Sequence, residues 1–140
     1  MVKFVFPFTK RKIGENTYIE EPKIPVTYLG GGESVELNAI IDSGSTTSFL
    51  PYEIAASLGF SKEKSESATA KGIGGEEETG KFEIDLKITR KNQRAFIRKM
   101  PVLVFLNPKQ KFCILGLSPL FEKFDITFRM KDGKIEMKER

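Results

Sequence analysis

Several segments of this 140-residue chain alternate apolar and polar residues with a period of two. The alternating apolar sets are Val2/Phe4/Phe6/Phe8, Val35/Leu37/Ala39/Ile41, Phe82/Ile84/Leu86/Ile88 and Phe124/Ile126/Phe128/Met130. Because successive side chains of a β-strand point to opposite faces, this period predicts strands with one buried face. Met100–Leu106 and Phe112–Leu115 are denser apolar runs, which predict strands buried on both faces.

Turn residues separate these segments, at Gly30–Gly32, Gly72–Gly75, Asn107–Pro108 and Asp132–Gly133. The last of these lies between two strand-like runs and predicts a hairpin. We expect only two short helices. Pro51–Leu58 begins with proline and stops at Gly59, and Ser118–Lys123 has Ser118 as a possible N-cap. Many strands with two brief helices predict a mainly-β fold, a closed barrel or closed sandwich.

The length fits one domain over residues 1–140, and 39% hydrophobic residues with twelve Phe are enough for a core. We expect no membrane association, because no apolar run approaches the roughly 18 residues of a membrane span. The start lacks a signal-peptide pattern. A single cysteine excludes an internal disulfide and favours a cytoplasmic location. The net charge of +4 is scattered rather than gathered in a stripe, so we expect no nucleic-acid partner.

The chain contains no histidine. This excludes Ser-His-Asp and Cys-His nucleophilic sites, histidine general bases and histidine-ligated metals. Any catalysis must therefore depend on carboxylates, lysines, hydroxyls or a cofactor.

A carboxylate follows one of the predicted strands directly. The sequence AIIDSGSTTSFLP places Asp42 after Ile41, and Ser43, Gly44 and Ser45 follow it. Gly44 permits a turn that a Cβ would hinder, and the two serines can hydrogen-bond within the loop. Taken alone, Asp42 is either an ordinary Asx-turn residue or a chemical group held in place by a rigid strand.

The Asp-Ser-Gly-Ser sequence after two β-branched residues resembles the active-site motif of aspartic peptidases. Three further features resemble the single-lobe, retropepsin-like branch of that family. Ser48–Pro51 precedes a short helix, Gly72-Ile73-Gly74-Gly75 is similar to the tip of a flap hairpin, and Cys113–Gly116 resembles the second signature. The three elements occur in the family's order, which implies an acid-protease-like single lobe.

The resemblance implies an aspartic endopeptidase that works as a homodimer on peptide or protein substrates, without metal or other cofactor. Asp42 and its symmetry mate Asp42′ would form a catalytic dyad that shares one proton and activates a water molecule. By the same resemblance, Ser43, Gly44 and Ser45 support the active-site loop, and the segment Gly72–Gly75 covers the substrate. A hydroxyl at Ser45 can donate to the ionised carboxylate. Acidic working conditions are implied.

Several residues also have simpler interpretations. The Gly72–Gly75 cluster could be a plain hairpin turn, and no Gly-Lys-Ser/Thr sequence supports a phosphate loop there. Glu76–Glu78 reads as a solvated charge run, which beside a flap tip could also repel acidic substrates. We expect Cys113 to be an inert core thiol and Asp125 to be a surface residue.

The chain departs from the retroviral pattern at two points. Leu117 stands where retroviral members carry an arginine that braces the dimer, and the segments before Asp42 and after Gly116 are longer. The dimer interface is therefore expected to differ from the retroviral one. An alternative function is a catalytically inactive peptide-binding or assembly module on the same fold.

Overall fold

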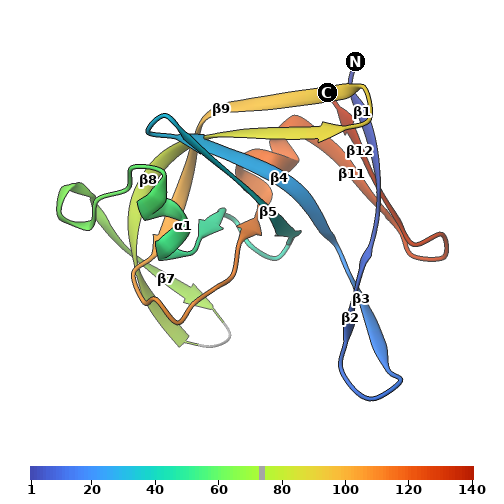
Figure 1. Cartoon of the computed structure of the whole chain (residues 1–140), viewed down its shortest axis with the longest axis horizontal. Coiled ribbons are helices and arrows are strands. Elements are labelled where there is room, and N and C mark those ends of the chain that lie inside the picture. The colour runs from blue at the N-terminus through green and yellow to red at the C-terminus, as the bar shows by residue number, and fades with distance from the viewer. Residues whose placement is uncertain (73–74) are drawn as a thin grey trace.

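The computed structural model describes residues 1–72 and 75–140. The fold is mainly β, as predicted (Figure 1). The strands are β1 (Lys3–Pro7), β2 (Thr9–Lys12), β3 (Tyr18–Glu21), β4 (Lys23–Gly30), β5 (Glu33–Ile41), β6 (Phe49–Leu50), β7 (Ser67–Gly72), β8 (Gly75–Arg90), β9 (Gln93–Phe105), β10 (Ile114–Leu115), β11 (Phe124–Arg129) and β12 (Lys134–Glu139). The helical segments are α1 (Tyr52–Ser57), the single turn η1 (Lys62–Lys64) and η2 (Leu117–Phe121).

The largest sheet has seven strands in the order β4-β5-β10-β6-β9-β8-β7. A further antiparallel pairing of β4 with β8, from Thr27 to Leu29, joins the sheet back on itself. Six strands therefore form a closed ring of pairings, and β7 extends it from β8 as a long hairpin. In this arrangement the short strand β10 lies between β5 and β6 and pairs with both.

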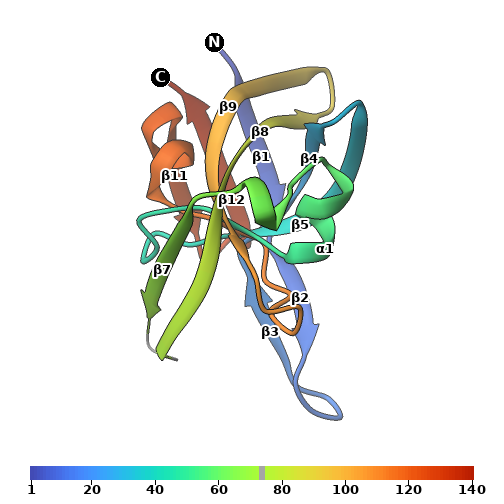
Figure 2. The same cartoon turned by 90° about the vertical axis from the view of Figure 1, so that its left-hand side faces the viewer.

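The terminal strands form a separate three-stranded antiparallel sheet in the order β1-β12-β11. The register of β1 on β12 runs from Lys3 opposite Lys138 to Pro7 opposite Lys134. Both views place the two termini close together at one end of the molecule (Figures 1 and 2). The β2–β3 hairpin and the β7–β8 hairpin extend towards the opposite end (Figure 2). Both chain ends are thus paired within their own chain.

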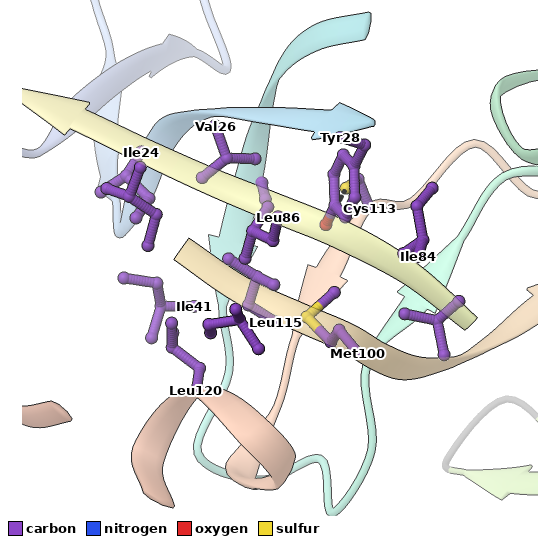
Figure 3. Close-up of a cluster of buried hydrophobic side chains, with 14 of the residues drawn as sticks. Ile24, Val26, Tyr28, Ile41, Ile84, Leu86, Met100, Cys113, Leu115 and Leu120 are labelled. Atoms are coloured by element: carbon purple, nitrogen blue, oxygen red, sulfur yellow. Dashed lines mark hydrogen bonds between the residues drawn. The ribbon is translucent and has the colours of Figure 1, made fainter. Parts of the chain in front are cut away.

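The buried apolar side chains form one core cluster, which joins the ring to the terminal sheet. Residues from β4, β5, β8, β9, β10 and η2 meet there (Figure 3). The fully buried side chains include Phe4, Phe6, Ile24, Tyr28, Leu50, Leu58, Leu86, Ile88, Met100, Leu115, Leu120 and Phe124. Burial of this apolar surface, at about 25 cal/mol per Å², is the main force that holds the ring together.

Cys113 is a buried thiol, as the sequence predicted. Its Sγ lies 3.3 Å from the hydroxyl oxygen of Tyr28 (Figure 3). Burial raises the pKa of Cys113 to about 11, and the hydrogen bond with Tyr28 offsets part of this effect. Thiolate is the reactive form, so little of it is present near neutral pH.

We expect iodoacetamide to alkylate the native chain at pH 8 at least about a hundredfold more slowly than the urea-unfolded chain. The physical reason is that both the raised pKa and the burial of Cys113 suppress the reaction. Mass spectrometry of timed samples measures the two rates. Equal rates in the two states would show that this thiol is accessible in the folded protein.

Some predicted elements differ from the structure. Met130 lies in the turn after β11 and is 66% exposed, because the strand ends at Arg129. Phe112 precedes β10 and is 63% exposed. The apolar run Phe112–Leu115 is therefore not a strand buried on both faces. In β9, Pro101 is exposed and Leu103 half-buried, so this strand has one buried face rather than two.

The two predicted helices are present, with small differences at their starts. Pro51 is the N-cap of α1 rather than its first helical residue. In the second helix, Gly116 holds the N-cap position, and the side chain of Ser118 makes no cap hydrogen bond. The sequence prediction missed η1, β4 and the β2–β3 hairpin.

Candidate active site

Asp42 follows the last residue of β5, and its backbone is held by the strand beside it. The short strand β10 lies between β5 and β6, parallel to the first and antiparallel to the second. The N–H of Asp42 donates to the carbonyl oxygen of Leu115 at 3.0 Å, which extends the parallel pairing by one residue. Asp42 therefore lies directly after the end of β5, as the sequence predicted.

The loop after Asp42 folds back on the carboxylate. The N–H of Gly44 donates to Oδ1 of Asp42 at 2.9 Å, and the N–H of Ser45 donates to the Asp42 carbonyl oxygen at 3.2 Å. The Ser45 hydroxyl donates to the carbonyl oxygen of Thr47 at 2.7 Å, rather than to the carboxylate of Asp42. Ser43 is exposed at the tip of the loop. In the single chain, Gly44 and Ser45 thus brace the loop, and Ser43 faces outward.

The segment around Gly116 locks the loop from the other side. The N–H of Leu117 donates to the carbonyl oxygen of Ser45 at 2.8 Å, and the buried hydroxyl of Ser48 accepts the N–H of Gly116 at 3.1 Å. A Cβ added at Gly116 would lie 2.2 Å from the carbonyl oxygen of Thr47. The backbone of Gly116 thus passes so close to the backbone of Ser45–Thr47 that only glycine fits there; this close approach is called the Gly116 crossing below. It explains the glycine of the second signature, Cys113–Gly116.

The carboxylate of Asp42 opens onto a groove with a volume of about 810 Å³. The groove is lined by Asp42, Gly44, Ser45, Thr46, Thr47, Phe49, Thr69, Ala70, Lys71, Gly72, Gly75, Glu77, Leu103, Phe105, Gln110 and Phe112. A second cleft of about 700 Å³ adjoins it at Thr47 and Leu103. The groove therefore unites the Asp42 loop with the hairpin formed by β7 and β8.

The predicted flap corresponds to the end of this hairpin. Gly72 and Gly75 pair at its tip, and both line the groove that contains Asp42. Ile73 and Gly74, which the sequence analysis assigned to the same tip, lie outside the described residues. The hairpin thus brings Gly72 and Gly75 to the same groove as Asp42.

Sequence reasoning missed the aromatic lining of the groove. The rings of Phe49 and Phe105 stack at a centroid distance of 4.9 Å and an interplanar angle of 11°. Phe112 adds an exposed ring to the same groove. No local pattern distinguishes these rings from core residues, since Phe49 and Phe105 become neighbours only through the long-range pairing of β6 with β9.

Asp125 lies on β11, outside the groove, and accepts a hydrogen bond from Arg140 at 2.8 Å. It is a surface residue, as predicted. Within residues 1–72 and 75–140, no three Asp, Glu, Cys or His side chains gather in a group able to hold a metal ion. No helix among these residues has the combination of length and apolar character that crossing a membrane requires.

The fold and the groove define a retropepsin-like protein. The structure matches a retropepsin-like aspartic protease from Rickettsia conorii with a TM-score of 0.63 and 13% identity, over 97% of this chain and 91% of that one. It also matches EIAV protease, solved in complex with the inhibitor HBY-793, with a TM-score of 0.52 and 23% identity, over 79% of this chain and 93% of that one.

The family model described as Aspartyl protease matches residues 24–119, which is more than half of the chain. This chain therefore belongs to the aspartyl protease family. The matched region includes the Asp42 loop, the β7–β8 hairpin and the Gly116 crossing. No curated protein matches the sequence significantly.

Proposed function

We propose that this chain is an aspartic endopeptidase that acts as a homodimer, with Asp42 and Asp42′ as its catalytic dyad. The observation that carries the proposal is the Asp42 carboxylate, which accepts the Gly44 N–H and lines a groove shared with the β7–β8 hairpin. Membership of the aspartyl protease family supports the same chemistry. The ring of six paired strands supports the closed single lobe on which the site depends.

In the proposed reaction, the ionised carboxylate of the dyad takes a proton from a water molecule, whose oxygen attacks the scissile carbonyl carbon. The protonated carboxylate donates its proton to the carbonyl oxygen, so a neutral tetrahedral diol forms. The carboxyl group that took the proton of the water then donates it to the leaving nitrogen as the C–N bond breaks. The other carboxylate, now ionised, takes a proton from a hydroxyl of the diol, so an amine and a carboxylic acid are released and the dyad again holds one proton. The groove suits an extended peptide, which can pair with the edge of β7 as an added strand.

The interface of this dimer is expected to differ from interleaved chain termini. In this chain β1 pairs with Lys134–Lys138 of β12, so exchange of the terminal strands with a second copy would have to replace this pairing. Leu117, which directly follows the Gly116 crossing, is 40% exposed. This apolar side chain next to the Asp42 loop supports a contact near the two-fold axis. We further propose a cytoplasmic location, supported by the single unpaired cysteine.

A subunit-mixing experiment tests the dyad. Wild-type chains are refolded with increasing fractions of Asp42→Asn chains, and cleavage of an unstructured protein is measured at several acidic pH values. Because both copies must supply a carboxylate, hydrolysis per total chain should fall with the square of the wild-type fraction. It should reach about a quarter at equal amounts. A statine-type inhibitor should block the cleavage by the wild type.

Asp125→Asn chains serve as the control for mixing, because Asp125 lies outside the groove. Mixtures with this variant should retain full activity. A linear fall with Asp42→Asn would contradict a shared site. No cleavage by the pure wild type at any pH would favour the peptide-binding or assembly module instead, and sedimentation in the same buffers reports the dimer directly.

A further inference from the structure

The three consecutive glutamates of β8 do not share one environment. In the antiparallel register of β7 and β8, Glu77 lies opposite Ala70, whereas Glu76 and Glu78 lie opposite Lys71 and Thr69. Because side chains alternate along a strand, Glu77 and Ala70 share one face of the hairpin. Both are half-buried, while the other four are exposed. Glu77 is thus the glutamate of this run whose side chain faces the groove.

A neutral group holds Glu77 in place. The side-chain amide of Gln110 donates from Nε2 to Oε1 of Glu77 at 2.7 Å, and both residues line the groove. Among the residues that the structure describes, no Lys or Arg forms an ion pair with Glu77. Its neighbour Glu76, in contrast, pairs with Lys71 at 3.7 Å. In the described part of the chain the carboxylate of Glu77 therefore has a neutral partner and no cationic one, and its second oxygen can accept a hydrogen bond from a ligand.

The groove is consequently acidic in a chain that is basic as a whole. Its charged lining residues are Asp42, Glu77 and Lys71, and the charge of Lys71 is offset by Glu76. The net charge of the whole chain is +4. A low-dielectric groove lined by charge of one sign concentrates the field and attracts ligands of the opposite sign. The local charge, rather than the overall one, determines which peptide side chains are favoured.

We propose that Glu77 makes the groove select peptides that carry a lysine or arginine close to the bond held at Asp42. The small side chain of Ala70 opposite Glu77 leaves room for a long aliphatic stem. The stem can lie along the apolar surface of Phe105 and Phe112, with the cationic end at the carboxylate. This inference rests on the proposed function for the position of the peptide, and it names the substrate class that the same groove prefers.

The test uses short unstructured peptides that are identical except for lysine, norleucine or glutamate at one position, which is scanned along the sequence. Two readouts are taken at about pH 6: kcat/KM for hydrolysis by the wild type, and binding of the labelled peptides to Asp42→Asn. The best lysine peptide should exceed its norleucine partner about tenfold in both readouts. Raising the salt concentration should reduce this advantage.

Glu77→Gln should remove the lysine advantage, and Glu77→Lys should invert it in favour of the glutamate peptide. Glu78→Gln is the matched control, because Glu78 is the next residue on the same strand but faces outward. It should retain the tenfold preference. The same preference in Glu77→Gln as in the wild type would overturn the inference, as would the absence of any lysine preference in the wild type.

The two readouts, peptide binding and hydrolysis, distinguish failure of this inference from failure of the proposed activity. A lysine preference in binding to Asp42→Asn that depends on Glu77 supports the inference even where the wild type hydrolyses nothing, and then the proposed reaction fails alone. Hydrolysis without a Glu77-dependent preference leaves the reaction in place and overturns the inference.

Discussion

Replacing Asp42 with asparagine should lower the rate of peptide hydrolysis by about 10²–10⁴-fold, the range typical for removal of a general acid or base. An amide can neither take the proton of the attacking water nor donate one to the carbonyl oxygen. In a homodimer the single substitution removes both carboxylates of the dyad. The measurement is kcat/KM for an unstructured peptide at acidic pH.

The fold should survive this substitution. The side-chain oxygen of an asparagine can still accept the hydrogen bond that Gly44 donates to Asp42 at 2.9 Å. We therefore expect the free energy of unfolding to change by no more than about 0.5 kcal/mol. Asp125→Asn removes a carboxylate that pairs with Arg140 on the surface, and it should leave kcat/KM unchanged. Wild-type rates in Asp42→Asn would refute the assigned role of this residue.

Replacing Gly116 with alanine should destabilise the fold by about 3 kcal/mol or more, the size expected when a side chain is forced into packed backbone. The added Cβ would lie 2.2 Å from the carbonyl oxygen of Thr47 and 2.6 Å from that of Ser45. Neither contact can be relieved by a side-chain rotation, because both atoms belong to the backbone. The hydrogen bonds of Leu117 with Ser45 and of Gly116 with Ser48 must therefore stretch or break.

Urea denaturation measures this loss, and the rate of peptide hydrolysis should fall with it because the Asp42 loop is displaced. Gly14→Ala is the matched control. A Cβ at Gly14 would meet Thr17 at 3.5 Å, which is an ordinary contact, so the change in stability should stay within about 0.5 kcal/mol. Equal stability of the two variants would show that the crossing at Gly116 can relax.

Local patterns predicted the parts of this fold whose signal lies in contiguous residues. The alternation that ends at Ile41 identified β5 and placed Asp42 at its end, and the glycine pair of Gly72 and Gly75 identified the hairpin. The same alternation is present in β4, where Ile24, Val26 and Tyr28 are buried. Pro25 has no N–H to donate within a sheet, and it lies outside the part of β4 that pairs with β8.

The remaining features depend on contacts between distant segments. Phe112 belongs to an apolar run and reads as a core residue, yet it lines the groove because β10 begins only at Ile114. Glu77 reads as one of three equivalent charges until the register with β7 distinguishes its face. The acceptor of the Ser45 hydroxyl, the carbonyl oxygen of Thr47, likewise follows from how the Gly116 segment closes the loop.

The insertion of β10 between β5 and β6 determines when the site can form during synthesis. Asp42 is made early, but its backbone partner Leu115 and the bracing segment at Gly116–Leu117 come more than seventy residues later. A growing chain on the ribosome therefore has no ordered Asp42 loop until nearly all of the domain has emerged. A nascent or truncated chain that ends before Cys113 has Asp42 but lacks the backbone contacts of Leu115 and Leu117 that order its loop. Any cleavage by the proposed site would therefore begin only when translation of the domain is almost finished.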